Sequence, residues 1–182
     1  LFEHNGELFM CPETLGANDI RIYRCADFPL RWELAQVAVA DVQACDTLIF
    51  PFEGRWWLLT TVDSAHTGQP AAELWAFSAD DPLGEWEPHP KNPLRNDTDS
   101  ARNAGLLHDG TDLFRVSQRH GFAVYGAAAT IRRITHLGAE GLIEEDVAEV
   151  TPDFRPDIHG VHHVHANSEV TVFDFVRHRR PR

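Results

Sequence analysis

The chain has 182 residues, of which 43% are hydrophobic, and its five Trp and eleven Phe supply enough apolar surface for a substantial core. Its formal net charge of −12 argues against a nucleic-acid partner, because phosphate binding needs clustered Lys and Arg. The one basic cluster, residues 177–182, reads as a solvated terminus. We find no apolar run long enough to span a bilayer and no secretory signal, although Leu1 falls inside a predicted strand, so an upstream segment is expected.

One short phrase occurs three times, at residues 1–10, 49–58 and 106–115. Each copy has a hydrophobic pair, a turn that ends in Gly, and further apolar residues. Asn5-Gly6 and Asp109-Gly110 readily adopt the positive φ angles of a two-residue hairpin turn, and Gly54 occupies the same place in the second copy. A hairpin that recurs roughly every 50 residues is typical of propeller blades.

The rest of each repeat predicts two more strands. A third strand is expected at 20–23 and 74–78, followed by a Pro turn and a Trp-Glu fourth strand around Trp32 and Trp86. The third repeat has a third strand at 122–127 and a longer variant through 131–134. Apolar residues alternate, which disfavours a helical solenoid. The other predicted strands are 1–3, 8–11, 47–51, 56–60, 104–107, 113–117 and 170–175.

Four antiparallel strands per repeat make a blade, so we predict a single all-β domain, a β-propeller, over residues 1–182. The expected blades are 1–42, 44–96, 100–152 and a partial unit at 160–177. Since a propeller ring needs four to eight blades, part of the first blade is expected upstream of residue 1.

The hairpins also predict which residues lie at the channel mouth. The inner strand of each blade starts eight residues before the turn Gly, at Asp46 and Arg102. Two-residue turns would pair these residues with Thr61 and Ser117 across the hairpin.

The same register places two more residues at this mouth, Glu13 in the first repeat and His162 in the last. Carboxylates, a guanidinium and an imidazole from different blades would then face one channel.

Several motifs resemble a known family: residues 2–6, 12–14, 45–48, 83–93, 100–105 and 160–162. They are similar to the five-bladed propeller domain at the N-terminus of glucosamine inositolphosphorylceramide transferases and in bacterial relatives, and the resemblance covers essentially the whole chain. That domain is in turn similar to glycoside hydrolase family 43 propellers, whose axial pocket binds a sugar between acidic residues. The resemblance therefore implies five blades and a carbohydrate-directed pocket. The chain departs from the family pattern at 117–120 and at His163, and the family's first Asp would fall before Leu1.

A sugar pocket explains the residue types at the mouth. Glycoside hydrolysis uses two flanking carboxylates, and Asp46 and Glu13 are the candidate catalytic pair. Arg102, Gln118, His162 and Ser100 are the candidate substrate-binding residues. The alternative is that these groups satisfy one another and bound water in a polar channel.

Two functions stay open from sequence. One is a carbohydrate-active enzyme, glycoside hydrolase-like or part of a glycosyltransferase; the other is a non-catalytic carbohydrate-binding or scaffold module of a larger protein. Several carboxylates at glycosidase spacing would favour the enzyme. The expected partner is a carbohydrate or glycoconjugate, with another domain of the same polypeptide as a further candidate, and no cofactor is expected.

The remaining reactive residues have simpler interpretations. Cys11, Cys25 and Cys45 lack metal-ligand spacing and are predicted to be small buried residues in a reducing compartment, which favours the cytoplasm. In the run from His159 to His165, His163 and His165 share one face and His162 points the other way, so no metal site is expected. Trp32 and Trp86 are predicted core residues.

Overall fold

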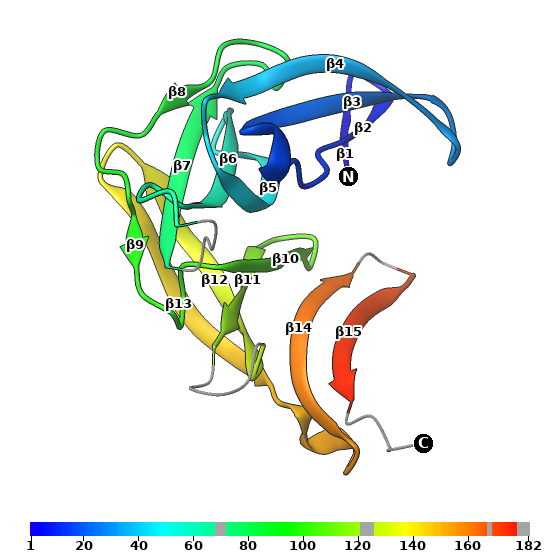
Figure 1. The fold of residues 1–182 in the computed structure, drawn as a ribbon, viewed down its shortest axis with the longest axis vertical. Coiled ribbons are helices and arrows are strands. Elements are labelled where there is room, and N and C mark those ends of the chain that lie inside the picture. The colour runs from blue at the N-terminus through cyan, green and yellow to red at the C-terminus, as the bar shows by residue number, and fades with distance from the viewer. Residues whose placement is uncertain (68–71, 121–125, 167–168, 178–182) are drawn as a thin grey trace. The chain divides into compact units, whose positions relative to one another are not determined.

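The computed structural model describes the chain except for residues 68–71, 121–125, 167–168 and 178–182 (Figure 1). Strands account for nearly all its regular structure, and the helical content of the described residues is two short 3-10 turns, η1 (Leu15–Ala17) and η2 (Pro152–Phe154). The predicted all-β class is therefore confirmed. The chain divides into two compact units, Leu1–Arg95 and Asn96–Arg182.

The N-terminal unit contains two antiparallel sheets. The first has the order β1-β2-β3-β4, and its strands are β1 (Phe2–His4), β2 (Glu7–Met10), β3 (Asp19–Asp27) and β4 (Arg31–Ala40). The second has the order β5-β6-β7-β8, with β9 (Arg95–Asn96) also paired to β7. Its strands are β5 (Ala44–Phe52), β6 (Arg55–Val62), β7 (Glu73–Ala79) and β8 (Glu87–Pro88).

Two-residue turns close both N-terminal hairpins, as predicted. Asn5 and Gly6 have φ angles of 50° and 77°, and His4 pairs with Glu7 across the turn. Glu53 and Gly54 repeat this conformation, with φ angles of 48° and 80°. Positive φ at both central residues matches the right-handed twist of the flanking strands.

The core of this unit includes Phe9, Ile22, Leu58, Phe77 and Trp86. These residues come from both sheets, so the two sheets share one apolar core. The burial of Trp86 confirms that it is a core residue, as predicted.

Trp32 was also predicted to be a core residue, but this prediction is wrong because Trp32 is only half-buried. The two indoles nevertheless make the same local contact. Trp86 Nε1 donates to the Pro82 carbonyl at 3.2 Å, and Trp32 Nε1 donates to the Pro29 carbonyl at 3.0 Å. Each indole therefore bonds to the carbonyl of its turn proline, although the spacing is three residues in the first repeat and four in the second.

The C-terminal unit has one four-stranded and one two-stranded antiparallel sheet. The first has the order β10-β11-β12-β13, formed by β10 (Asn103–His108), β11 (Leu113–Arg119), β12 (Ala128–Gly138) and β13 (Gly141–Val150). The second pairs β14 (Ile158–Ala166) with β15 (Thr171–Arg177). Ala104, Val116 and Ala129 pack with Val161 and Val164, so a shared core joins the two sheets. Most of the strand predicted at 122–127 lies outside the described residues.

The third hairpin corrects one prediction. His108 pairs with Leu113, so the loop is the four-residue segment Asp109–Asp112 and not a two-residue turn. The Asp109 carboxylate accepts hydrogen bonds from the backbone N–H groups of Thr111 and Asp112, at 2.9 and 2.7 Å. These bonds lower the pKa of Asp109. The Asp side chain thus holds a longer loop that the Asp-Gly dipeptide alone did not reveal.

Candidate functional site

The two predicted catalytic carboxylates lie close together in the N-terminal unit. Glu13 is in the loop after β2, and Asp46 is in β5. One carboxylate oxygen of each residue and the Cys45 sulfur all lie within 4.8 Å of one another. Glu13 is exposed, Asp46 is half-buried and Cys45 is buried. Two residues that are 33 positions apart in sequence therefore form an acidic pair.

A β-bulge sets the direction of Asp46. Cys45 pairs with Thr61 and the next pair is Leu48 with Leu59, so β5 carries one extra residue there. Asp46 has a φ angle of 53°, in the left-handed region that few non-glycine residues adopt. The predicted pairing of Asp46 with Thr61 is therefore wrong by one residue, because the bulge shifts the register.

Hydrogen bonds hold this bulge in place. The buried Thr60 hydroxyl donates to the Cys45 carbonyl at 3.0 Å and lies 2.8 Å from the Thr47 hydroxyl. The Cys45 thiol donates to an Asp46 carboxylate oxygen at 3.4 Å. Cys45 is thus a thiol that supports Asp46, and none of the three cysteines forms a disulfide bond. Cys11 and Cys25 are half-buried where burial was predicted, and desolvation raises the pKa of Cys11 to about 12.

The C-terminal unit has a bulge at the matching place in β10. Asn103 pairs with Ser117, and the next pair is Gly105 with Val116. The predicted pairing of Arg102 with Ser117 is therefore also wrong by one residue. Cys45 pairs with Thr61, and Asn103 pairs with Ser117, the residue of the third repeat that corresponds to Thr61. Asn103 is therefore equivalent to Cys45, so Arg102 does not occupy the position equivalent to Asp46.

Gln118 lies at this second bulge. Its side chain is only 1% exposed, and its Nε2 donates to the Asn103 carbonyl at 2.9 Å. Its Oε1 is buried and has no hydrogen-bond partner among the residues that the structure describes. A buried acceptor of this kind is costly unless a ligand or water pairs with it. Arg102 is half-buried, and its carbonyl accepts the backbone N–H of Gln118 at 2.8 Å.

Asp97 holds Ser100 in a tight turn. The Ser100 hydroxyl donates to Asp97 at 2.6 Å, and its backbone N–H donates to the other carboxylate oxygen at 2.5 Å. Burial alone would raise the pKa of Asp97, but these bonds and one from the Asp99 N–H together lower it. Ser100 therefore helps to fix the conformation of the loop that precedes β10.

His162 interacts with Asp174 on the neighbouring strand. His162 Nδ1 lies 2.8 Å from one Asp174 oxygen, and the other oxygen accepts the backbone N–H groups of His162 and His163, at 3.0 and 2.6 Å. The carboxylate thus fills a bulge between Val161 and Val164. The His163 and His165 rings stack with centroids 6.5 Å apart, and burial lowers the pKa of His165.

Sequence reasoning missed the buried ion pair of Arg115 and Glu144. Arg115 Nε and Nη2 donate to the two Glu144 oxygens at 2.7 and 2.8 Å, and Nη1 donates to the Asn103 side-chain oxygen at 3.1 Å. The bidentate pair therefore anchors β13 to β11 and holds Asn103 at the β10 bulge. Its only sequence signal is a charged residue, Arg115, between the apolar Phe114 and Val116 of β11.

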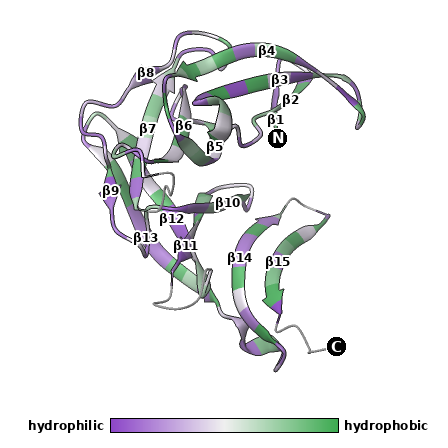
Figure 2. Cartoon of the chain, in the orientation of Figure 1, coloured by the Kyte–Doolittle hydropathy of each residue, from purple (hydrophilic) through white to green (hydrophobic). Residues whose placement is uncertain are grey.

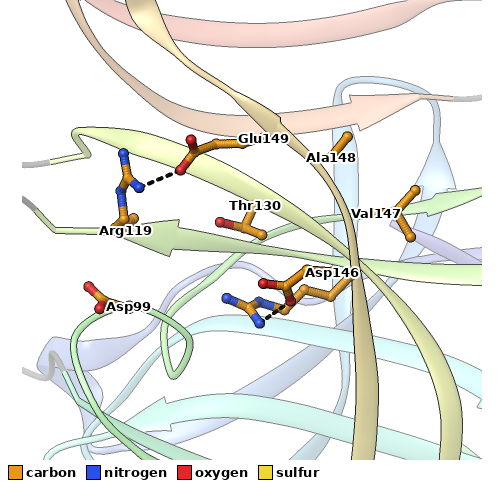
Figure 3. A pocket seen from close by; sticks show the side chains of 8 residues that line it. Asp99, Arg119, Thr130, Asp146, Val147, Ala148 and Glu149 are labelled. Carbon is orange, nitrogen blue, oxygen red and sulfur yellow. Dashed lines mark hydrogen bonds and ion pairs between the residues drawn. The ribbon is translucent and has the colours of Figure 1, made fainter.

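A cavity of about 450 Å³ lies over β12 and β13 (Figure 3). Arg119 pairs with Glu149 at 2.6 Å, and Arg132 pairs with Asp146. The other lining residues are Asp99, Thr130, Val147 and Ala148. None of the predicted site residues lines this cavity, and both of its arginines are paired within it.

Comparison with known proteins identifies a family. The model for "Glucosamine inositolphosphorylceramide transferase 1, N-terminal" matches residues 1–159. Glucosamine inositolphosphorylceramide transferase 1 of Arabidopsis thaliana is 38% identical over 156 residues, which cover 81% of this chain and 19% of the relative. The protein of the same name from Oryza sativa subsp. japonica is 32% identical over 144 residues, 77% of this chain and 19% of the relative. The chain thus spans about a fifth of the length of these relatives.

A solved structure supports the fold class. CoXyl43, a family 43 β-xylosidase/α-arabinofuranosidase from a compost microbial metagenome, is 12% identical with a TM-score of 0.51, over 72% of this chain and 52% of that enzyme. This similarity concerns the fold alone. Within the described residues, no helix has the length and apolar character needed to cross a membrane.

Proposed function

Because the chain belongs to the family of N-terminal domains of glucosamine inositolphosphorylceramide transferase 1, we propose that it is a carbohydrate-active domain whose site is built on Glu13 and Asp46. The observation that carries this proposal is the approach of the two carboxylates to within 4.8 Å. We further propose that the complete ring is a five-bladed propeller with an axial sugar-binding pocket.

One oxygen of each carboxylate lies within 4.8 Å of the other, and this closeness fits one type of glycosidase chemistry better than the other. Carboxyl groups roughly 5 to 5.5 Å apart are typical of retaining glycosidases, whereas inverting enzymes need about 6.5 to 9.5 Å to admit a water molecule. Asp46, held by the bulge and by the Cys45 thiol, would be the nucleophile. Glu13, exposed on its loop, would exchange a proton with the glycosidic oxygen.

Arg102, Gln118, Ser100 and His162 remain proposed ligand-binding residues. Gln118 has the strongest support, because its buried Oε1 could accept a hydrogen bond from a sugar hydroxyl. His162 would bind through Nε2 while Nδ1 pairs with Asp174. Ser100 would act mainly on the loop before β10, through its bonds to Asp97.

A binding module is the second candidate. The chain spans 19% of the length of the plant relatives, so a transfer reaction could be located in the rest of such a protein. In that case Glu13 and Asp46 would accept hydrogen bonds from sugar hydroxyls without taking part in bond cleavage.

The experiment is a screen of glycans and glycoconjugates, with calorimetry for binding and product analysis for turnover. Glu13→Gln should weaken the response to the selected ligand, whereas Glu3→Gln, at an exposed position on β1, serves as the matched control. Where turnover is found, the carboxylate spacing predicts a product of retained anomeric configuration. No binding to any glycan, or equal binding by both variants, would contradict the proposal.

A further inference from the structure

The strand β15 pairs on one side only. It bonds to β14, and no other strand of the described chain pairs with it. The remaining sheets of the structure contain at least four strands each. A strand at a sheet edge presents a row of backbone N–H and C=O groups that can pair with a further strand. A two-stranded ribbon is also only marginally stable by itself.

The side chains of β15 expose much apolar surface. Val172, Phe173 and Phe175 are 60%, 43% and 38% exposed. Phe154 of η2, 46% exposed, lies edge-on to Phe173 and Phe175 with ring centroids 5.6 and 6.5 Å away. Figure 2 shows how much of β15 is hydrophobic. The phenyl rings of Phe154, Phe173 and Phe175 form what we call the aromatic cluster.

The edge strand β13 has a different character. Its exposed residues include Glu145, Asp146 and Glu149, and such charges are a common protection against pairing with other strands. In β15 the one acidic residue is Asp174, and its carboxylate is already bonded to the backbone of His162 and His163. Large apolar side chains therefore dominate the exposed positions of β15, whereas β13 combines exposed Ile143 and Val147 with three charged residues.

We propose that β15 and the aromatic cluster receive a further antiparallel strand from the same polypeptide, outside residues 1–182. This inference rests on the proposal that the chain is one domain of a larger protein, which the length of the plant relatives supports. Backbone bonds would supply affinity, and alternate apolar side chains of the added strand would cover Phe173 and Phe175. The occupant is thus an extended segment with apolar residues at every second position.

The first test is amide hydrogen exchange on the natural polypeptide that contains these residues. β15 should be protected like β11 and β12, which pair on both sides, and not like the edge strands β4 and β13. Phe173→Ser with Phe175→Ser should reduce this protection by at least about tenfold, since the cluster is lost. The matched control is Ile143→Ser with Val147→Ser, two exposed apolar residues on β13. Exchange of β15 at the rate of β4 and β13 would overturn the proposal.

The second test identifies the occupant without disturbing the fold. A photoreactive phenylalanine analogue at position 173 should cross-link within the same polypeptide to a segment outside residues 1–182, at a yield independent of protein concentration. A cross-link between two copies, or to another protein, would overturn the proposal, as would the absence of any cross-link. Sugar binding plays no part in either readout, so failure here is distinct from failure of the proposed function.

Discussion

Arg115 and Glu144 form a buried bidentate ion pair, with exposed side-chain fractions of 0% and 2%. Its two N–O distances, 2.7 and 2.8 Å, are those of strong charge-assisted hydrogen bonds. Because the pair joins β11 to β13 and also holds Asn103, it ties the outer strand of the sheet to the bulge.

We predict that Glu144→Ala lowers the free energy of unfolding by about 3 to 5 kcal/mol, because Arg115 is left buried without its counter-ion. The double replacement Arg115→Met with Glu144→Leu should cost much less, since it removes both charges. Denaturant unfolding of the two proteins is the measurement. Equal losses would show that packing, and not the unpaired charge, dominates at this site.

Gly105 is predicted to tolerate no side chain. Its φ angle is 135°, and an added Cβ would lie 1.9 Å from the Val164 carbonyl oxygen. Gly105→Ala should therefore destabilise the protein by roughly 3 kcal/mol or more, because β10 must move away from β14. Gly54→Ala is the control, since its φ angle of 80° is also positive but nothing lies within 4 Å of the added Cβ. A cost for Gly105→Ala no larger than that of the control would refute the close contact.

Asp97 should make stability depend on pH in acid. Its folded pKa lies below its ordinary value, so its contribution is complete above the unfolded pKa and is lost as the pH falls through the folded pKa. Wild type should therefore lose this contribution below about pH 4, whereas Asp97→Asn lacks it at every pH. Unfolding free energies measured from neutral to acid pH, with Asp99→Asn as control, test this. Parallel curves for wild type and Asp97→Asn would disprove it.

The sequence predicted the strands better than their register. Alternation of apolar residues located the hairpins, and positive φ at Asn5-Gly6 followed from residue type, whereas Glu53 adopts positive φ although its residue type does not favour it. The bulges at Asp46 and Ala104 were not predictable, because one extra residue leaves the local pattern of a strand almost unchanged.

The candidate site was predicted in part. The proximity of Glu13 and Asp46 was expected from the repeat, although the register assumed for Asp46 was off by one residue. The partners of Arg115, Ser100 and His162 were missed, because they depend on side-chain packing across strands and loops. Such contacts follow from three-dimensional register and carry no pattern along the chain.

The most direct test of the account is a paired measurement of ligand affinity and turnover for Asp46→Asn. Asp80→Asn is the matched control, because the Asp80 side chain is 96% exposed. Each Asp→Asn substitution keeps the size of the side chain and removes its charge. Both variants should therefore unfold like wild type. We predict a turnover loss of about 10²- to 10⁴-fold with affinity largely retained if Asp46 is catalytic. A parallel, moderate loss of affinity without turnover in either protein would indicate a binding module, and unchanged affinity and turnover would contradict the assignment of Asp46 to the site.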